Sequence, residues 1–590
     1  MKPNETRSSR WGATLLALCA TIFSAGMAFA SPQKISRDLQ ANTTADQVDV
    51  IVQFTDVPTA ESHQKILNRG GSVKRQLGHF KGAAYSMPAS ALADLADDPD
   101  VVYISPDRPL NGASASKPVA VNDYHLGTIN ASAASAQGLN GAGIGVAVID
   151  SGIASLPDIT AKNIVYSQDF TGSGSTADQY GHGTHVTGIL AGNGSKSSGS
   201  GYSYTFLGVA DGVSLVNLRV LNSAGEGTDS EVIAAIQEAI SLKSQYNIRV
   251  INLSLGRPVW ESYTVDPLCQ AVEDAWKAGI VVVVASGNFG RDDNAGTLGY
   301  GTITAPGNDP YVITVGAMNT KGTSNRADHV IASYSSKGPT IFDSVVKPDL
   351  VAPGNLVDSL YFSTATLNKE NPGFEIPQSL YVTNGPVNPS ATYYALSGTS
   401  MATPMVSGAA ALLLQKSPTL TPDQVKARLM QTAFKGLLPS STATDLFTGQ
   451  TFQNQADIFT VGCGYLDIQA ALANTNLAPN TAGSAMSPLA VISSKGDVTL
   501  VANGSSVIGS DSILWGSSIL WGSSILWGSS SEVDGSSILW GSSTSLSGSS
   551  ILWGSSVTSQ SILWGSSETQ VDGANALWGS TTGDELIDME

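Results

Sequence analysis

The stretch Ser397-Gly398-Thr399-Ser400-Met401-Ala402-Thr403-Pro404 runs directly into the small and apolar residues 405–414. An alanine- and leucine-rich run after a Gly-Thr turn predicts a buried helix. The hydroxyl of Ser400 then lies in the first helical turn, beside unpaired backbone N–H groups and the positive end of the helix dipole. This environment suits a nucleophile whose attack on a carbonyl creates an oxyanion, although a serine at a helix start is more often an N-cap.

Length and charge limit the classes of protein to consider. The chain has 590 residues, more than one hydrophobic core usually holds, so we expect at least two folded units or long appendages. The formal net charge of −18 argues against nucleic acid or an anionic membrane as a partner. No apolar run is long enough to predict a transmembrane segment.

Residues 1–30 have the features of a secretory signal peptide. Basic residues precede an apolar run over 13–23, and Ala28-Phe29-Ala30 supplies small residues for cleavage after Ala30. We therefore expect a secreted, extracellular protein. Removal of this segment leaves Cys269 and Cys463, which in an oxidising compartment either pair or remain as two buried thiols.

Residues 31–113 predict a small α+β module. Strand patterns occur at 48–54, 83–87 and 101–104, and helical spacing occurs at 60–77 and 89–96. This order fits a split β-α-β arrangement. Because the module lies between a signal peptide and a larger domain, it is a candidate prosegment, and the small polar residues 111–116 are a candidate cleavage region.

Residues 114–475 predict an α/β domain with a mostly parallel sheet sandwiched between helices. Apolar strands are expected at 144–149, 214–220, 250–255 and 280–285, with helices at 229–242 and 267–278. In such sheets functional groups gather at the carboxyl ends of the strands. Asp150, Ser254 and Asn288 each follow a predicted strand, so we expect them to converge.

Residues 476–590 form a biased tail with Ser-Ile-Leu-Trp-Gly-Ser-Ser repeats over about 511–580. A six-residue step places equivalent side chains on one face of an extended chain, so stacked short strands are one prediction. The irregular later spacing fits a flexible, adhesive tail equally well. In either form the tail could self-associate or bind a cell surface.

The serine hypothesis requires a base and an acid elsewhere in the chain. His182 lies between Gly181 and Gly183, where backbone and substrate can approach the ring, although a histidine in such a place is more often an ordinary loop residue. Asp150 ends a buried strand, where an unpaired carboxylate is costly, so it requires a donor such as an imidazole N–H. Taken alone, such an aspartate is more often a turn former.

Together, three motifs resemble in order the signature blocks of the subtilisin-like serine peptidases. They are Ala147-Val148-Ile149-Asp150-Ser151-Gly152-Ile153, Gly181-His182-Gly183-Thr184-His185-Val186 and Gly398-Thr399-Ser400-Met401-Ala402-Thr403-Pro404. The resemblance covers about residues 140–475. The N-terminal module resembles the inhibitory prosegment of the same family.

The resemblance implies roles for individual residues. Ser400 is the expected nucleophile, His182 the general base and later acid, and Asp150 the group that orients the imidazole. Asn288 and the Ser400 backbone N–H form the expected oxyanion hole, where one donor is typically worth about 100- to 1,000-fold in rate. The expected substrate-binding residues are Gly225, Glu226, Gly227, Ser254, Leu255, Gly256, Ala285, Ser286, Gly287 and Thr304. Thr304 stands where many relatives have glycine, so it predicts a pocket too narrow for the largest aromatic side chains.

Some positions depart from the family pattern. Met405 replaces a usual histidine, Arg257 replaces a frequent glycine, and residues 355–392 form an insertion that we expect to be a surface excursion. The chemistry is expected to require no cofactor. Structural calcium is compatible with the family, and Asp158 is one conceivable ligand. Residues 192–204 do not reproduce a recognisable calcium loop, however, so no metal ligand is assigned.

The sequence thus predicts a secreted serine endopeptidase made as a self-processing zymogen, with protein substrates and its own prosegment as partners. One alternative is a catalytically inactive surface scaffold acting through the repeat tail. The other is a serine-carboxyl peptidase, which uses acidic residues in place of His182 and Asn288; a neutral-to-alkaline pH optimum would separate the two enzymes.

Overall fold

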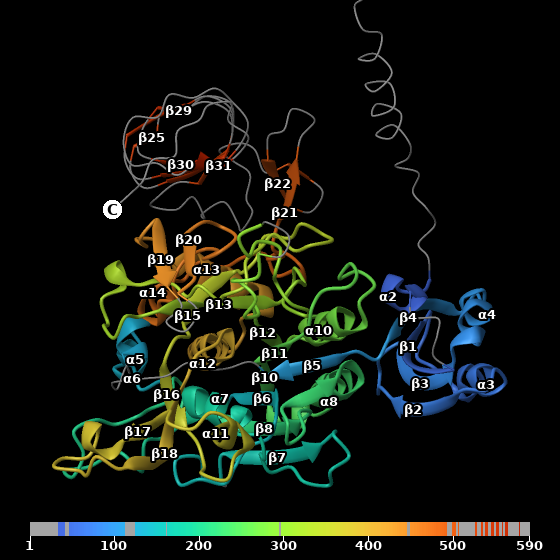
Figure 1. The fold of residues 1–590 in the computed structure, drawn as a ribbon, viewed down its shortest axis with the longest axis horizontal. Coiled ribbons are helices and arrows are strands. Elements are labelled where there is room, and N and C mark those ends of the chain that lie inside the picture. The colour runs from blue at the N-terminus through green and yellow to red at the C-terminus, as the bar shows by residue number, and fades with distance from the viewer. Residues whose placement is uncertain are drawn as a thin grey trace, which may run out of the picture.

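The computed structural model describes residues 34–41, 46–112, 124–160, 162–293, 297–444, 449–492 and 498–502, followed by short strands between 505 and 578 (Figure 1). The predicted signal peptide and residues 113–116 of the predicted cleavage region lie outside the described residues.

The N-terminal module is a four-stranded antiparallel sheet in the order β2-β3-β1-β4. Its elements are α2 (Arg37–Ala41), β1 (Gln47–Phe54), α3 (Ala60–Leu67), β2 (Ser72–Gln76), β3 (Gly82–Pro88), η1 (Ala89–Ala91), α4 (Leu92–Ala96) and β4 (Val101–Pro106). The prediction of one helix over 60–77 is wrong after Leu67. Gly70 adopts a φ of +79°, which ends the helix, and the chain turns back as strand β2.

A short strand leaves this module and enters the larger domain (Figure 1). Strand β5 (Pro109–Gly112) pairs antiparallel with β9 (Glu226–Thr228) on one side and with β11 (Leu255–Gly256) on the other. The end of the N-terminal module is therefore the middle strand of a sheet whose two edges belong to the larger domain.

The larger domain is built on an eight-stranded sheet in the order β14-β13-β12-β10-β6-β8-β7, with β15 also paired to β13. The strands are β6 (Gly145–Asp150), β7 (Ile164–Asp169), β8 (Ser214–Arg219), β10 (Ile248–Leu253), β12 (Val281–Ala285), β13 (Ile313–Asn319), β14 (Val330–Ile331) and β15 (Leu350–Pro353). All pairs are parallel except β13 with β14. This pairing confirms the predicted mostly parallel α/β sheet. The apolar strands β6, β8, β10 and β12 are buried, as is usual where helices cover both faces of a sheet.

Helices pack against this sheet in two groups. Helix α12 (Thr399–Lys416) is buried from Thr399 to Leu414 and packs against α7 (His182–Ala191) and strands β10, β12 and β13. Helices α8 (Asp229–Ser241) and α10 (Pro267–Lys277) pack against each other; α8 contacts β6, β8 and β10, and α10 contacts β12. Further helices of the domain are α5 (His125–Thr128), α6 (Ser132–Ser135), α9 (Lys243–Tyr246), η2 (Arg326–Asp328), α13 (Pro422–Thr432) and α14 (Ile468–Ala473). None of the helices described has both the length and the apolar character needed to cross a membrane.

The insertion over 355–392 forms a small sheet with its flanking residues. Strands β16 (Val357–Leu360), β18 (Pro389–Leu396) and β17 (Glu375–Pro377) pair antiparallel in that order, and α11 (Thr366–Glu370) and η3 (Gln378–Leu380) lie between them. The sheet is anchored to the domain body, because the Tyr393 hydroxyl donates a 2.6 Å hydrogen bond to Asp158 Oδ2. Asp158 Oδ1 accepts from Ser195 Oγ and Lys196 N, each at 2.8 Å.

The structure also bears on the two cysteines and on a possible metal site. Cys269 is buried and Cys463 is partly buried, and both are free thiols. In the described part of the chain, no group of three or more His, Cys, Asp or Glu side chains is arranged to hold a metal ion.

Short strands also lie near the end of the larger domain and in the tail that follows it. Strands β19 (Ser440–Thr444) and β20 (Thr451–Gln455) form a hairpin, and β21 (Leu489–Ile492), β22 (Val498–Ala502) and β23 (Ser505–Ser506) form an antiparallel sheet. The repeat-tail strands form two sets: β24 (Ile525–Trp527), β26 (Ser537–Trp540), β28 (Ser550–Trp553), β30 (Ser561–Trp564) and β31 (Leu577–Trp578), then β25 (Val533–Asp534), β27 (Thr544–Ser547) and β29 (Val557–Thr558). Pairing in both sets is parallel, and equivalent tryptophan positions such as Trp540 and Trp553 are direct partners.

Candidate active site

A buried aspartate and histidine meet where a strand ends and a helix begins. Asp150 is the last residue of β6, and His182 is the first residue of α7. His182 Nδ1 lies 2.8 Å from Asp150 Oδ1, and both side chains are fully shielded from solvent. This close approach requires Gly183, since a Cβ there would lie 2.3 Å from the Gly152 carbonyl oxygen and 3.1 Å from the Asp150 carboxylate. The predicted pairing of an imidazole with this strand-end carboxylate is present in the structure.

A second buried carboxylate, Asp178, fixes the geometry of this pair. Its Oδ1 accepts from Ser151 Oγ at 2.9 Å and from Gly181 N at 2.7 Å. Its Oδ2 accepts from the backbone N–H and the hydroxyl of Thr184, at 2.9 and 2.6 Å. Asp178 thereby ties the end of β6 to the first turn of α7. The sequence prediction did not include this positioning residue, whose only sequence signal is an acid four residues before the histidine.

The electrostatic surroundings of His182 favour the imidazolium. Burial has the largest single effect and disfavours the charged ring, but the Asp150 charge and hydrogen bond outweigh it and raise the pKa of His182 above its usual value. With Nδ1 held by Asp150, the ring directs Nε2 away from the carboxylate, and Nε2 has no hydrogen-bond partner among the described residues. A ring held in this way can accept a proton at Nε2 while Asp150 stabilises the resulting cation.

Ser400 is locked into the first turn of α12 by reciprocal hydrogen bonds with Ser254. The Ser400 hydroxyl donates to the Ser254 carbonyl oxygen at 3.0 Å, and the Ser254 hydroxyl donates to the Ser400 carbonyl oxygen at 2.9 Å. Asn252 extends this network, donating from Nδ2 to Ser254 Oγ at 3.0 Å and accepting at Oδ1 from Ser407 Oγ at 2.8 Å. The first turn of the serine-bearing helix is therefore hydrogen-bonded directly to the edge that carries Ser254.

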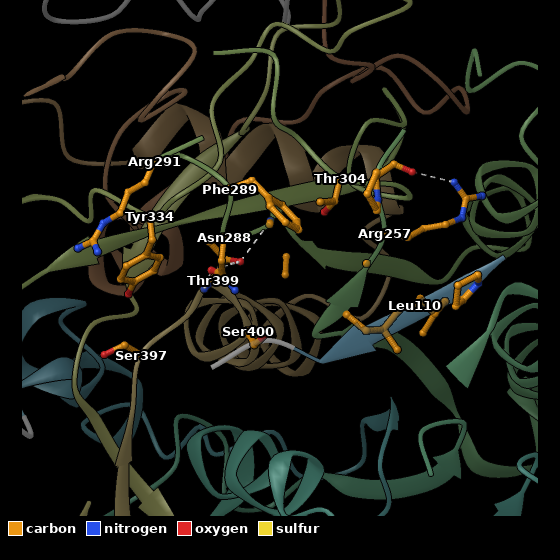
Figure 2. A pocket seen from close by; sticks show the side chains of 16 residues that line it. Leu110, Arg257, Asn288, Phe289, Arg291, Thr304, Tyr334, Ser397, Thr399 and Ser400 are labelled. Carbon is orange, nitrogen blue, oxygen red and sulfur yellow. Dashed lines mark hydrogen bonds between the residues drawn. The ribbon is translucent and has the colours of Figure 1, made fainter. Parts of the chain in front are cut away.

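The side chain of Asn288 is oriented by the residue before Ser400. Asn288 follows β12, and its Oδ1 accepts from the Thr399 backbone N–H at 2.9 Å and the Thr399 hydroxyl at 3.2 Å (Figure 2). These bonds assign the oxygen to Thr399 and leave the Nδ2 amide as a donor beside Ser400. An amide held in this way is pre-organised to stabilise a developing oxyanion.

The two predicted substrate edges are occupied by β5. Asn111 lies opposite Glu226 and Gly256, and Leu110 lies opposite Gly227. Gly112 lies opposite Leu255. Strand pairing of this kind binds an extended peptide through its main chain, largely independently of its side chains. The structure thus places an extended segment of the chain in the position that the sequence predicts for a peptide.

A cavity of about 400 Å³ opens beside Ser400 and Asn288 (Figure 2). Among the predicted substrate-binding residues, Leu255, Gly256, Ala285, Gly287 and Thr304 line it. Thr304 fills the space between the two walls, because a Cβ added at Gly256 or Gly287 would lie 2.7 or 2.6 Å from its side chain. The remaining lining residues are Pro109, Leu110, Arg257, Pro258, Phe289, Arg291, Tyr334, Ser397 and Thr399.

Not every predicted residue lies in the cleft. Gly225 belongs to a turn before β9, with a φ of +76°, and does not pair with β5. Ser286 is buried behind the cavity wall, where its carbonyl oxygen accepts from Thr304 N at 3.0 Å. Phe289 and Tyr334 line the cavity but were not predicted, because neither belongs to a recognisable sequence motif.

Comparisons with known proteins agree with this geometry. Residues 141–464 match the model of the subtilase family. Serine protease AprX of Bacillus subtilis is 37% identical over 302 residues, which cover 50% of this chain and 62% of AprX. Subtilisin E of the same organism is 35% identical over 434 residues, or 72% of this chain and 94% of subtilisin E.

A solved structure is also similar in fold. It is that of fervidolysin from Fervidobacterium pennivorans, a keratinolytic enzyme related to subtilisin, and it superposes with a TM-score of 0.54 at 23% identity. The match covers 78% of this chain and 67% of fervidolysin.

The interaction between Asp150 and His182 predicts that the pKa of His182 lies above its usual value and depends on the Asp150 carboxylate. Because the carboxylate raises the pKa of His182, the imidazolium should persist above the ordinary value near 6.5, and Asp150→Asn should lower the pKa by leaving burial unopposed. NMR titration of labelled histidine, in a Ser400→Ala background that prevents self-digestion, measures both values. Asp94→Asn, on the exposed surface of the N-terminal module, is the matched control. A His182 pKa that is unchanged by Asp150→Asn would contradict this electrostatic assignment.

Proposed function

The chain belongs to the subtilase family of serine endopeptidases, and we propose that it is a secreted zymogen that hydrolyses proteins through an acyl-enzyme on Ser400. One observation carries the proposal: β5, an extended peptide segment, is paired with both β9 and β11 and leads toward Ser400. The hydrogen-bonded pair of His182 and Asp150 supplies the base that such a nucleophile requires.

The proposed reaction follows from the positions of four groups. The Ser400 hydroxyl rotates from the Ser254 carbonyl toward His182, loses its proton to Nε2, and attacks the peptide carbonyl carbon. The Asn288 amide and the Ser400 backbone N–H stabilise the oxyanion. His182 then donates its proton to the departing amine, leaving an ester on Ser400. Water adds to this ester with His182 again as base, which releases the acid product and restores the serine.

The chain's own residues supply the nucleophile, the base and the oxyanion donors, so we propose that the chemistry requires no cofactor. Structural calcium elsewhere is compatible with this mechanism, and we assign no residue to it. The Asp158 oxygens are already engaged by Ser195, Lys196 and Tyr393, which argues against Asp158 as a ligand.

We further propose that residues 31–113 are an inhibitory prosegment that the enzyme removes itself. Because β5 pairs with both substrate edges, it competes directly with any other peptide. Gly112, the last residue of β5, is opposite Leu255, and the residue before Leu255 is Ser254, whose carbonyl oxygen accepts the hydrogen bond of the Ser400 hydroxyl. We therefore expect cleavage between Ala113 and Ser114.

The signal-like residues 1–30 support secretion, and we propose that the repeat tail attaches the enzyme to a surface or to other copies of itself. The parallel pairing of the repeat-tail strands supports a stacked arrangement for it. A catalytically inactive scaffold acting through this tail is the alternative function. The oriented pair of Asp150 and His182 argues against it, since a scaffold has no need of a buried hydrogen bond between an aspartate and a histidine.

Secretion of the wild type and of Ser400→Ala tests the proposed function. The wild type should mature to a chain beginning at Ser114 and degrade casein in EDTA, whereas Ser400→Ala should retain its prosegment and lose essentially all activity, about a million-fold. N-terminal sequencing and a casein assay measure both results. Ser417→Ala, at the far end of α12, is the matched control and should mature normally. Maturation and casein degradation by Ser400→Ala would contradict the assignment, and an inactive wild type would favour the scaffold.

The cavity predicts a limit on the size of the side chain at the residue before the cleaved bond. Thr304 occupies the space between Gly256 and Gly287, so small and medium side chains should be preferred over Phe or Tyr. Thr304→Gly should raise kcat/KM for a Phe peptide roughly tenfold or more relative to an Ala peptide, as expected for added pocket volume. Cleavage of the Ala peptide at its original rate shows that the variant is folded. A wild type that already prefers Phe or Tyr would contradict this role of Thr304.

A further inference from the structure

Glu261, in the segment after β11, is an acid whose hydrogen-bond partners all come from the N-terminal module. Its Oε1 accepts from Arg108 Nη1 at 2.6 Å, and its Oε2 accepts from Arg108 Nη2 at 2.9 Å and from the Tyr103 hydroxyl at 2.8 Å. The side chain is 5% exposed. Within the described residues, the larger domain donates no hydrogen bond to this carboxylate, so removal of the prosegment would leave it without these donors.

Neighbouring carboxylates in the larger domain have a cation of their own. Arg257 donates from Nε to Asp229 Oδ1 and from Nη2 to Asp266 Oδ1, both at 2.8 Å, and all three side chains are buried. The charge of Asp266 acts unfavourably on Glu261. Glu261 thus differs from Asp229 and Asp266, because the cation paired with it is Arg108 of the N-terminal module.

Arg108 reaches Glu261 from a position on the peptide-binding edge. It directly precedes β5, and its carbonyl oxygen accepts from Asp229 N at 2.9 Å, which continues the main-chain pairing beyond Thr228. Counted back from Ala113 as the residue before the cleaved bond, Arg108 is the sixth residue, P6. Any peptide that follows the path of β5 would therefore present its P6 side chain to Glu261.

The two-point contact with Glu261 favours the guanidinium of an arginine over the ammonium of a lysine. Two Arg108 nitrogens meet the two Glu261 oxygens, a fork-to-fork arrangement that a lysine ammonium cannot reproduce. Asp38 of the prosegment also accepts from Arg108, at 2.9 and 3.0 Å. In a bound substrate these Asp38 bonds would be replaced by water, and the Glu261 bonds would remain.

We infer that Glu261 forms a substrate subsite of the mature enzyme that binds an arginine at P6. The inference rests on the proposed peptidase function and extends it to a sequence preference distant from the cleaved bond. The arginine adds binding far from the reacting atoms, so it should lower KM and leave kcat nearly unchanged.

Internally quenched peptides with the sequence X-Pro-Leu-Asn-Gly-Ala-Ser test the inference on the mature wild-type enzyme, with X as arginine, lysine or citrulline. Citrulline keeps the shape of arginine and lacks its charge. We expect kcat/KM to be roughly tenfold higher for arginine than for citrulline, as is usual for hydrogen bonds to a charged group, with lysine between them. The difference should lie in KM and shrink with added salt.

Glu261→Gln should cleave the arginine and citrulline peptides equally, at the rate of wild type on citrulline. Glu273→Gln, an acid paired with Lys277 on α10, is the matched control and should keep the arginine preference. Equal cleavage of the two peptides by wild type would overturn the inference alone and restrict Glu261 to docking the prosegment. That result needs no variant, so it holds even if Glu261→Gln fails to mature. No cleavage of any peptide would overturn the proposed function, and the inference with it.

Discussion

The hydrogen bond between Asp150 and His182 is the interaction on which the rest of the site depends. A carboxylate in a fully buried position is costly without donors, and here Oδ1 has two, the imidazole at 2.8 Å and the Ser151 N–H at 2.7 Å. Asp178 holds the strand end and the helix start together, so the bond does not rely on flexible side chains. The ring is thereby fixed with Nε2 directed away from the carboxylate and without a hydrogen-bond partner among the described residues.

The parallel sheet explains how residues so distant in sequence converge. Strands β6, β10 and β12 run in the same direction, so Asp150, Ser254 and Asn288 emerge at one edge. Helix α12 is buried along its length and cannot shift without disrupting the core, and its reciprocal bonds with Ser254 fix its first turn to that edge. A rigid nucleophile and a rigid peptide edge are what accurate positioning of a peptide bond requires.

Much of this could be predicted from sequence, because the decisive signals are local. The valine-rich run of β12 predicts a buried strand, and the Ser400 motif predicts the start of a helix. The contributions of Asp178 and Glu261 could not be predicted, because each depends on hydrogen-bond donors that only the fold brings close. Ser151 donates to Asp178, and Arg108 donates to Glu261. The strand β2 was missed for a related reason: the helical spacing before it continued past Gly70, whose backbone conformation ends the helix.

Strand β5 occupies both edges of the cleft, and under the proposed function a substrate would pair with the same two edges. The central claim is that the buried pair of Asp150 and His182 activates Ser400. Labelling of the mature protein with a serine-directed fluorophosphonate, followed by peptide mapping, tests it most directly. The account predicts a single adduct on Ser400 that is lost in His182→Ala. An unlabelled Ser400, or equal labelling without the histidine, would contradict it.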